Sequence, residues 1–240
     1  MSGLIEVPTP DGAMPAHLWL PPSGSGPGIL LVQEVFGISP YIECRAQDLA
    51  DLGYVVLAPE IWWRLGVSRV EEGPQALEEA FGLLERSDWG LAVSDAAQAL
   101  STVEGRPEVT RGAGIVGFCY GGGLAYAVAA RTSPDVLVSY YGSALPELLG
   151  LAEHPGVDQV PPTEVTARQL HHFGLADRFL GRPTVEQIRD ILVRQDNVTF
   201  ETYDADHAFD NDDFFLYDGA ASALAWQRTL AFLEQHLPVG

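Results

Sequence analysis

The segment GFCYGGG at residues 117–123 limits the possible folds more than any other part of this sequence. It directly follows the apolar stretch 114–116, so it predicts a buried strand, a sharp turn with Cys119 at its apex, and a glycine-rich start of a helix. Such a turn places its apex residue on strained backbone, and larger side chains two positions before or after it would collide with the chain. We therefore predict a nucleophile elbow that carries a thiol in place of a hydroxyl.

Short apolar runs alternate with longer helical patterns around this turn. This alternation predicts an α/β fold with a mainly parallel twisted sheet flanked by helices on both faces. The expected strands are 4–7, 16–20, 28–33, 54–58, 113–117, 136–141, 165–173 and 198–203. The first two flank the Asp11-Gly12 turn and predict an antiparallel hairpin at the sheet edge.

The expected helices are 41–52, two within 69–104 that separate near Ser87-Asp88, 121–131, 184–194 and 214–236. Residues 143–163 are expected to form a long connection or a short lid helix. No repeat, low-complexity tract or linker divides the sequence. We therefore expect a single domain over residues 1–240.

Composition excludes several classes of partner. The formal charge is −20, from 33 acidic residues against 13 basic ones, all of them arginine. Such a surface repels phosphate backbones and anionic bilayers, so we expect neither nucleic acid nor membrane as a partner. No apolar run is long enough to span a membrane, and residues 1–10 lack the pattern of a signal peptide. With two cysteines, no disulfide framework is expected, which favours a reducing cytoplasm. The expected state is a monomer or small homo-oligomer, which the sequence does not narrow further.

A cysteine nucleophile needs a base, and the base needs an acid that orients it. On an open parallel sheet these groups follow successive strands in the order nucleophile, acid, histidine. Asp177 follows one expected strand in the sequence GLAD, and His207 follows the last strand in DADH. The competing residues fit this order or spacing less well; they are His17, His154, His171, His172, His236, Asp135, Asp196, Asp204 and Asp206.

The segment QEVFG at residues 33–37 follows the buried strand 28–33. We expect the backbone N–H groups of Val35 and Tyr120 to form an oxyanion hole. Glu34 leaves a buried strand, so it needs a partner. It either modulates the ionisation of Cys119 or forms an ion pair with an arginine such as Arg64.

Four motifs in order, QEVFG, GFCYGG, GLAD and DHAF, resemble those of the dienelactone hydrolase (carboxymethylenebutenolidase) family of α/β-hydrolases. The resemblance extends from about Ile5 to Leu237. It implies a hydrolase of small esters or lactones with a Cys119–His207–Asp177 triad, an acyl-thioenzyme intermediate, and neither cofactor nor metal. It also implies that Glu34 holds the proton of the thiol until substrate displaces it, and that Arg64 binds a substrate carboxylate.

The sequence departs from the family pattern at Asn211, where the family's second substrate-binding arginine is expected. An amide within the acidic stretch 210–213 weakens the binding of a carboxylate, so a neutral or less acidic ester or lactone becomes plausible. Six aromatic residues could form a wall of the pocket, although each could equally belong to the core; they are Phe36, Trp62, Trp63, Tyr141, Phe179 and Phe209. Of these, Phe36 and Tyr141 are the candidates for substrate contact.

Two alternative functions remain open from the sequence. The first is a non-catalytic binding or scaffold protein that has kept the elbow. The second is a redox-sensing thiol protein. Cys44 lies in the helical pattern 41–52 and is expected to be buried and inert. If Cys44 is buried, Cys119 has no obvious second cysteine with which to form a disulfide.

Overall fold

A computed structural model describes residues 2–71 and 73–240 of the chain. Its strands are β1 (Ser2–Thr9), β2 (Gly12–Trp19), β3 (Gly26–Val32), β4 (Val55–Pro59), β5 (Val109–Phe118), β6 (Val136–Tyr140), β7 (Arg168–Gly174) and β8 (Val198–Tyr203). They form one sheet in the order β1-β2-β4-β3-β5-β6-β7-β8. The pairs β1–β2 and β2–β4 are antiparallel and the others are parallel. The predicted edge hairpin and mainly parallel sheet are confirmed.

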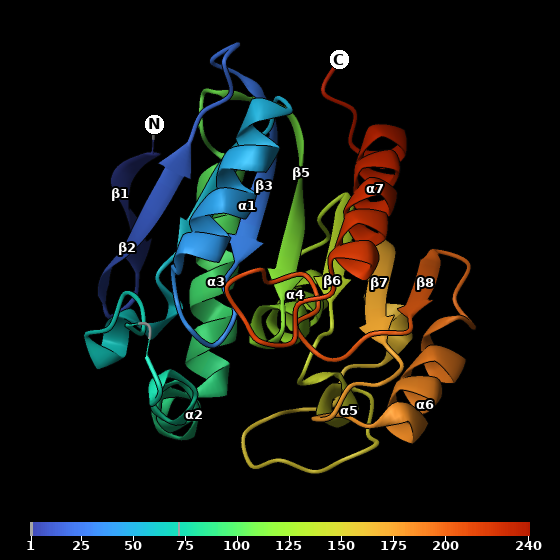
Figure 1. Cartoon of the computed structure of the whole chain (residues 1–240). Coiled ribbons are helices and arrows are strands. Elements are labelled where there is room, and N and C mark those ends of the chain that lie inside the picture. The colour runs from blue at the N-terminus through green and yellow to red at the C-terminus, as the bar shows by residue number, and fades with distance from the viewer. Residues whose placement is uncertain (1, 72) are drawn as a thin grey trace.

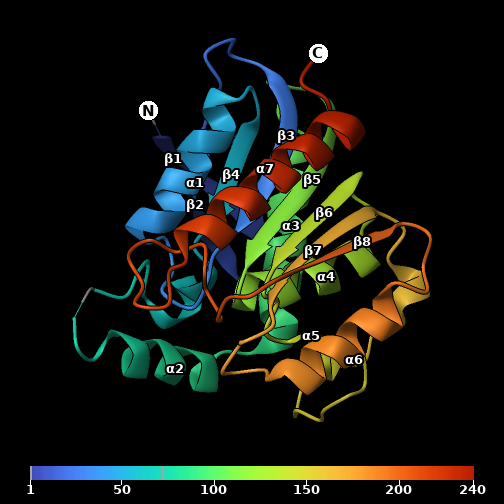
Figure 2. The ribbon, with the colours of Figure 1, turned by 45° about the vertical axis from the view of Figure 1, so that its right-hand side comes forward.

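Helices cover both faces of this sheet (Figures 1 and 2). They are α1 (Pro40–Asp51), α2 (Ala76–Arg86), α3 (Trp89–Glu104), α4 (Tyr120–Arg131), α5 (Leu145–Leu148), α6 (Arg182–Leu192) and α7 (Gly219–His236), with short 3₁₀ turns at Ile61–Leu65 and Pro162–Glu164. Apolar side chains of α1 and α7 pack in one core cluster, and those of α3 and α4 pack in another. Strands β3, β4 and β6 are buried along their whole length. This burial explains why they are continuous apolar runs.

Two helices begin later than the sequence pattern suggests. Helix α2 begins at Ala76 because Gly73-Pro74 interrupts the helical pattern that starts near residue 69. Helix α7 begins at Gly219, since Asp218 is its N-cap and accepts hydrogen bonds from the N–H groups of Ala220 and Ala221. Residues 214–218 therefore remain in the loop after β8.

The parallel strands end at one edge of the sheet, and that edge carries the site. Segment 33–37 follows β3, Cys119 follows β5, Asp177 follows β7 and His207 follows β8. This arrangement is typical of α/β enzymes, whose sites lie beyond the carboxyl ends of the strands. Within residues 2–71 and 73–240, no helix is both long and apolar enough to cross a bilayer.

Candidate active site

Cys119 lies at the apex of the turn between β5 and α4, with backbone angles φ 54° and ψ −117°. A non-glycine residue in this region costs on the order of 1–3 kcal/mol, so surrounding contacts must hold it there. The N–H of Cys119 donates to the carbonyl of Tyr140 at 2.9 Å, and its carbonyl accepts from the N–H of Gly122 at 2.9 Å and of Ser143 at 3.0 Å. A Cβ on Gly121 would meet the backbone carbonyl oxygens of residues 32 and 33. The predicted need for glycine at that position is confirmed.

The structure brings Cys119, His207 and Asp177 together. His207 Nε2 lies 3.2 Å from Cys119 Sγ, and His207 Nδ1 lies 2.7 Å from Asp177 Oδ2. The other carboxylate oxygen of Asp177 accepts from the backbone N–H groups of Phe179 and Leu180, each at 2.9 Å. These contacts fix the carboxylate, which in turn fixes the imidazole ring.

Burial and charge act in opposite directions on His207, which is only 3% exposed. Burial alone would lower its pKa, but the thiolate charge of Cys119 and the hydrogen bonds to Cys119 and Asp177 outweigh burial and raise the pKa to about 10. The imidazolium form of His207 is therefore stabilised at this site. A protonated histidine beside a cysteine is the kind of environment that favours a thiolate nucleophile.

Val35 lies in the loop after β3 and Tyr120 is the first residue of α4, and the two lie at the same sheet edge because β3 pairs with β5. In the part of the chain that the structure describes, neither backbone N–H donates to a protein acceptor. The carbonyl of Val35 accepts from Trp62 Nε1 at 3.0 Å, and the ring of Tyr120 packs 4.9 Å from that of Trp62. The indole of Trp62 therefore contacts both Val35 and Tyr120, and the backbone N–H groups of these two residues remain available near Cys119.

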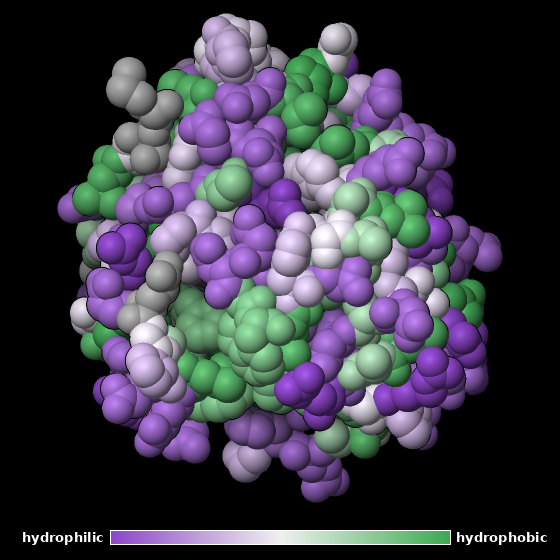
Figure 3. Space-filling model, viewed as in Figure 1, coloured by the Kyte–Doolittle hydropathy of each residue, from purple (hydrophilic) through white to green (hydrophobic). Residues whose placement is uncertain are grey.

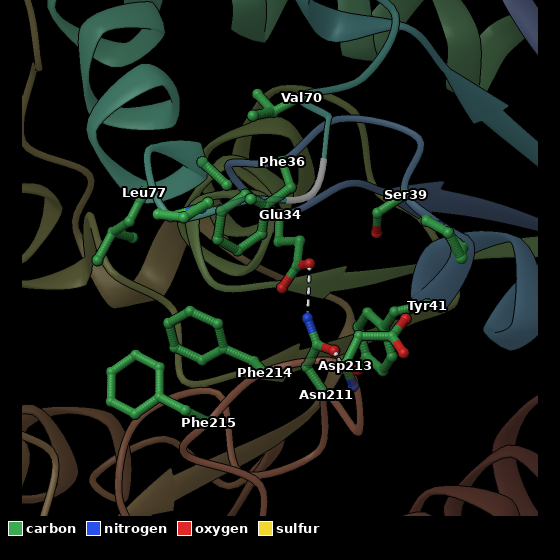
Figure 4. Close-up of a pocket in the computed structure, with 14 residues that line it drawn as sticks. Glu34, Phe36, Ser39, Tyr41, Val70, Leu77, Asn211, Asp213, Phe214 and Phe215 are labelled. Atoms are coloured by element: carbon green, nitrogen blue, oxygen red, sulfur yellow. Dashed lines mark hydrogen bonds between the residues drawn. The ribbon is translucent and has the colours of Figure 1, made fainter.

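Glu34 is 1% exposed, and its Oε1 accepts a hydrogen bond from Asn211 Nδ2 at 2.9 Å (Figure 4). Burial raises the pKa of Glu34 to about 7, although Asn211, His207 and Ser39 lower it in part and Asp210 raises it further. Arg64 instead pairs with Asp95 at 2.9 Å and with Asp11 at 2.7 Å. The alternative ion pair between Glu34 and Arg64 is therefore wrong.

Two adjoining pockets surround these residues. The inner pocket has a volume of about 130 Å³ and is lined by Glu34, Val35, Phe36, Leu77, Phe81, Leu84, Cys119, Ser143, Phe179, His207, Ala208 and Phe214. The outer pocket has about 450 Å³ and is lined by Glu34, Phe36, Ser39, Pro40, Tyr41, Val70, Gly73, Pro74, Ala76, Leu77, Asn211, Asp213, Phe214 and Phe215. Figure 3 shows hydrophobic residues gathered around a hollow on the face where α2 and the β8–α7 loop lie. No lysine or arginine is found among the described residues that line either pocket.

The predicted substrate residues occupy different places. Phe36 lines both pockets. Tyr141 is fully buried, with its ring 5.0 Å from that of His207, and Arg64 lies outside the described lining of both pockets. Phe179 lines the inner pocket, whereas Trp62 and Phe209 are buried in the core and Trp63 donates to Asp95.

Sequence analysis missed the contribution of α2, whose residues Leu77, Phe81 and Leu84 could have been suspected only from their spacing on one helical face.

A second feature that sequence analysis missed is the anchor of the His207 loop. Asp210 is fully buried and accepts hydrogen bonds from Tyr41 at 2.6 Å, Arg45 at 2.9 Å and Ser222 at 2.7 Å. The guanidinium of Arg45 also lies over the ring of Trp226. The loop that carries His207 is thus fastened to both α1 and α7.

Cys44 differs from the prediction. It lies on α1 but is exposed, because the buried side of that helix is formed by Tyr41, Ile42, Ala46, Leu49 and Ala50. The prediction that the Cys44 side chain is buried is therefore wrong. No group of three or more His, Cys, Asp or Glu residues suited to a metal ion is found over residues 2–71 and 73–240.

Comparisons with known proteins identify the family. The sequence profile described as "Dienelactone hydrolase family" matches residues 14–237. The chain belongs to the dienelactone hydrolase family. It is 28% identical over 236 residues to carboxymethylenebutenolidase 1 of Cupriavidus pinatubonensis, covering 97% of each chain. It is 30% identical to the carboxymethylenebutenolidase of Pseudomonas putida, covering 95% of this chain and 94% of the relative.

A crystal structure of a dienelactone hydrolase-type protein from Klebsiella pneumoniae is similar, with a TM-score of 0.81, 27% identity and 98% coverage of both chains. The dienelactone hydrolase-like promiscuous phosphotriesterase P91, from metagenomic libraries, shares the fold with a TM-score of 0.77, 21% identity and 98% coverage of both chains. The α/β-hydrolase fold is therefore confirmed. Family membership makes the chain a hydrolase of the carboxylic ester and lactone type.

Replacing Asp210 by asparagine tests the loop anchor. The change removes the buried counter-ion of the partly buried guanidinium of Arg45, which keeps only the more exposed Asp48 at 3.0 Å, so we expect the free energy of unfolding to fall by about 3 kcal/mol. Urea denaturation measures this loss. The exposed neighbour Asp212 has no hydrogen-bond partner in the described residues, and Asp212→Asn should change stability by less than about 0.5 kcal/mol. Equal effects of the two substitutions would contradict the proposed anchor.

The raised pKa of Glu34 predicts a pH-dependent stability. The folded state binds this proton more tightly than the unfolded state, so its contribution is fully present below pH 4.5 and is lost as pH rises to about 7. Glu34→Gln removes this dependence. Relative to wild type, the variant should therefore gain on the order of 1–3 kcal/mol between pH 5 and pH 8. Urea denaturation of both proteins at the two pH values measures the gain, and an unchanged difference would contradict it.

Proposed function

We propose that this protein hydrolyses small esters or lactones that carry no carboxylate, through an acyl-thioenzyme formed on Cys119. The observation that carries the proposal is the position of one imidazole ring. His207 Nε2 lies 3.2 Å from Sγ while its other ring nitrogen is bound to Asp177. In this geometry the histidine can hold the proton of the thiol and return it to a leaving oxygen.

In the first half-reaction, the thiolate of Cys119 attacks the carbonyl carbon and forms a C–S bond. The carbonyl oxygen becomes an oxyanion, which accepts hydrogen bonds from the N–H groups of Val35 and Tyr120. The tetrahedral adduct then collapses and its C–O bond breaks. His207 transfers its proton to the departing alkoxide, which stays attached to the acyl group if the substrate is a lactone.

In the second half-reaction, the neutral His207 accepts a proton from water as the water oxygen attacks the thioester carbonyl. The same two N–H groups stabilise the second oxyanion, and collapse breaks the C–S bond. The products are the carboxylic acid, the Cys119 thiolate and a protonated His207, so the starting state is restored. Asp177 keeps the ring oriented through both steps. Removing one oxyanion donor typically costs about 10²–10³ in turnover.

The preference for a substrate without a carboxylate is supported by the charges around the pockets. Asn211 donates to Glu34 in the position where an arginine was expected, and Arg64 is already engaged by Asp95 and Asp11. A substrate carboxylate in the inner pocket would meet Glu34 and no facing guanidinium among the described lining residues. Like charges in a pocket of low dielectric repel strongly, which disfavours an anionic substrate.

The two cysteines provide a matched test of the nucleophile. We expect Cys119→Ala to lower kcat for p-nitrophenyl acetate by at least about 10³, because the covalent step is removed, while the melting temperature changes little. Cys44→Ala, at an exposed site on α1, should retain wild-type turnover. Wild-type activity in Cys119→Ala would rule out the proposed mechanism.

A further inference from the structure

The outer pocket combines aromatic rings with carboxylates. Its aromatic wall consists of Phe36, Tyr41, Phe214 and Phe215. The ring centroids of Phe36 and Phe214 are 5.7 Å apart, and those of Phe214 and Phe215 are 4.6 Å apart. Phe215 is 69% exposed, so its ring lies at the rim. Ring faces around a cavity attract cations through their quadrupoles. The guanidinium of Arg178 already lies over the ring of Phe215 and that of Arg45 over the ring of Tyr41, which leaves Phe36 and Phe214 as the rings for a ligand cation.

Glu34 and Asp213 supply the negative charges of this pocket (Figure 4). Glu34 is buried, and its carboxyl accepts a hydrogen bond from the amide of Asn211. A hydrogen bond with the hydroxyl of Ser39 also lowers the pKa of Glu34. Both groups are uncharged. A buried carboxylate is costly when no positive charge compensates it. The described lining of the pocket provides no lysine or arginine for this purpose, whereas a bound cation would.

The outer pocket is also placed to receive part of a substrate. It shares Glu34, Phe36, Leu77 and Phe214 with the inner pocket, which contains Cys119. A substrate whose carbonyl carbon lies against Cys119 can therefore extend its distant end past Glu34 into the outer pocket. The formal charge of −20 also favours the approach of a cation over that of an anion.

From this geometry we propose that the outer pocket binds a cationic group, a quaternary ammonium or a protonated amine, on the non-reacting part of the substrate. The proposal rests on the proposed function, since it specifies the substrate of the same site. A purely apolar substituent would fit the aromatic wall but would leave the carboxyl of Glu34 with only the partial compensation that His207 provides. The reacting ester or lactone remains neutral, and the positive charge lies on the attached group.

A pair of esters with the same shape isolates the charge. Acetylcholine and 3,3-dimethylbutyl acetate differ only in that a quaternary nitrogen replaces a quaternary carbon. We expect wild-type protein at low ionic strength to favour acetylcholine by about tenfold in kcat/KM, mainly through KM. The ratio of the two kcat/KM values cancels any effect of a substitution on the chemical steps.

Substitutions then assign the preference to the pocket. Glu34→Gln should reduce the ratio to near one, and Asp213→Asn should reduce it about twofold. Asp212→Asn removes the same charge from a neighbouring exposed residue outside the described pocket lining, and it should leave the ratio unchanged. A wild-type ratio at or below one overturns the inference. So does a ratio that falls equally in Asp212→Asn and Asp213→Asn, or one that neither Glu34→Gln nor Asp213→Asn lowers.

Failure of the proposed function is distinguishable from failure of this inference. If wild-type protein hydrolyses neither acetate ester nor p-nitrophenyl acetate, the proposed function is wrong, and tetraethylammonium binding tests the pocket alone. Calorimetry should then show binding that Glu34→Gln weakens and Asp212→Asn does not. Absence of binding to the wild type would overturn the inference as well. Turnover of the neutral ester without a preference for the cation overturns the inference but leaves the proposed function standing.

Discussion

Cys119 can meet His207 because the chain turns abruptly at the end of β5, and that turn depends on backbone that a non-glycine residue rarely adopts. The hydrogen bond that Cys119 donates to Tyr140, and those that its carbonyl accepts from Gly122 and Ser143, hold this conformation. Gly121 lets β3 and α4 approach so closely that even one methyl group would meet the backbone of β3. The strained backbone at Cys119 is therefore held in place by the buried centre of the sheet.

His207, the partner of Cys119, lies on a loop, so other contacts must hold that loop in place. The loop after β8 is held by the buried pair of Asp210 and Arg45, whose geometry is completed by Tyr41 and Ser222. Burying such a pair rarely adds much net stability, but removing one partner is costly, so the pair defines a single loop conformation. On its other side, His207 is held by Asp177, whose carboxylate is fixed by two backbone N–H groups. The imidazole is thus positioned from two directions before any substrate arrives.

Local patterns were sufficient to predict the sheet, the elbow and the positions of His207 and Asp177 at strand ends, because glycines, apolar runs and strand order determine these features directly. They were not sufficient for Asp210, whose partner Arg45 lies 165 residues away in the sequence. They also failed for Cys44, since helical spacing alone did not show which side of α1 faces the sheet. The partner of Glu34 was missed for the same reason, because Asn211 reaches it across 177 residues. Contacts between distant loops have no local signature.

The resulting site combines a stabilised imidazolium, two free backbone donors and a pocket without an arginine among its described lining residues, so it is suited to acyl transfer from a substrate without a carboxylate. The most direct measurement of this account is rapid quenching of wild-type protein during turnover of p-nitrophenyl acetate, followed by peptide mass spectrometry. The account predicts an acetyl group on Cys119, formed in a burst that matches the enzyme concentration. An acetyl group on a serine, or turnover with no covalent adduct on Cys119, would contradict it.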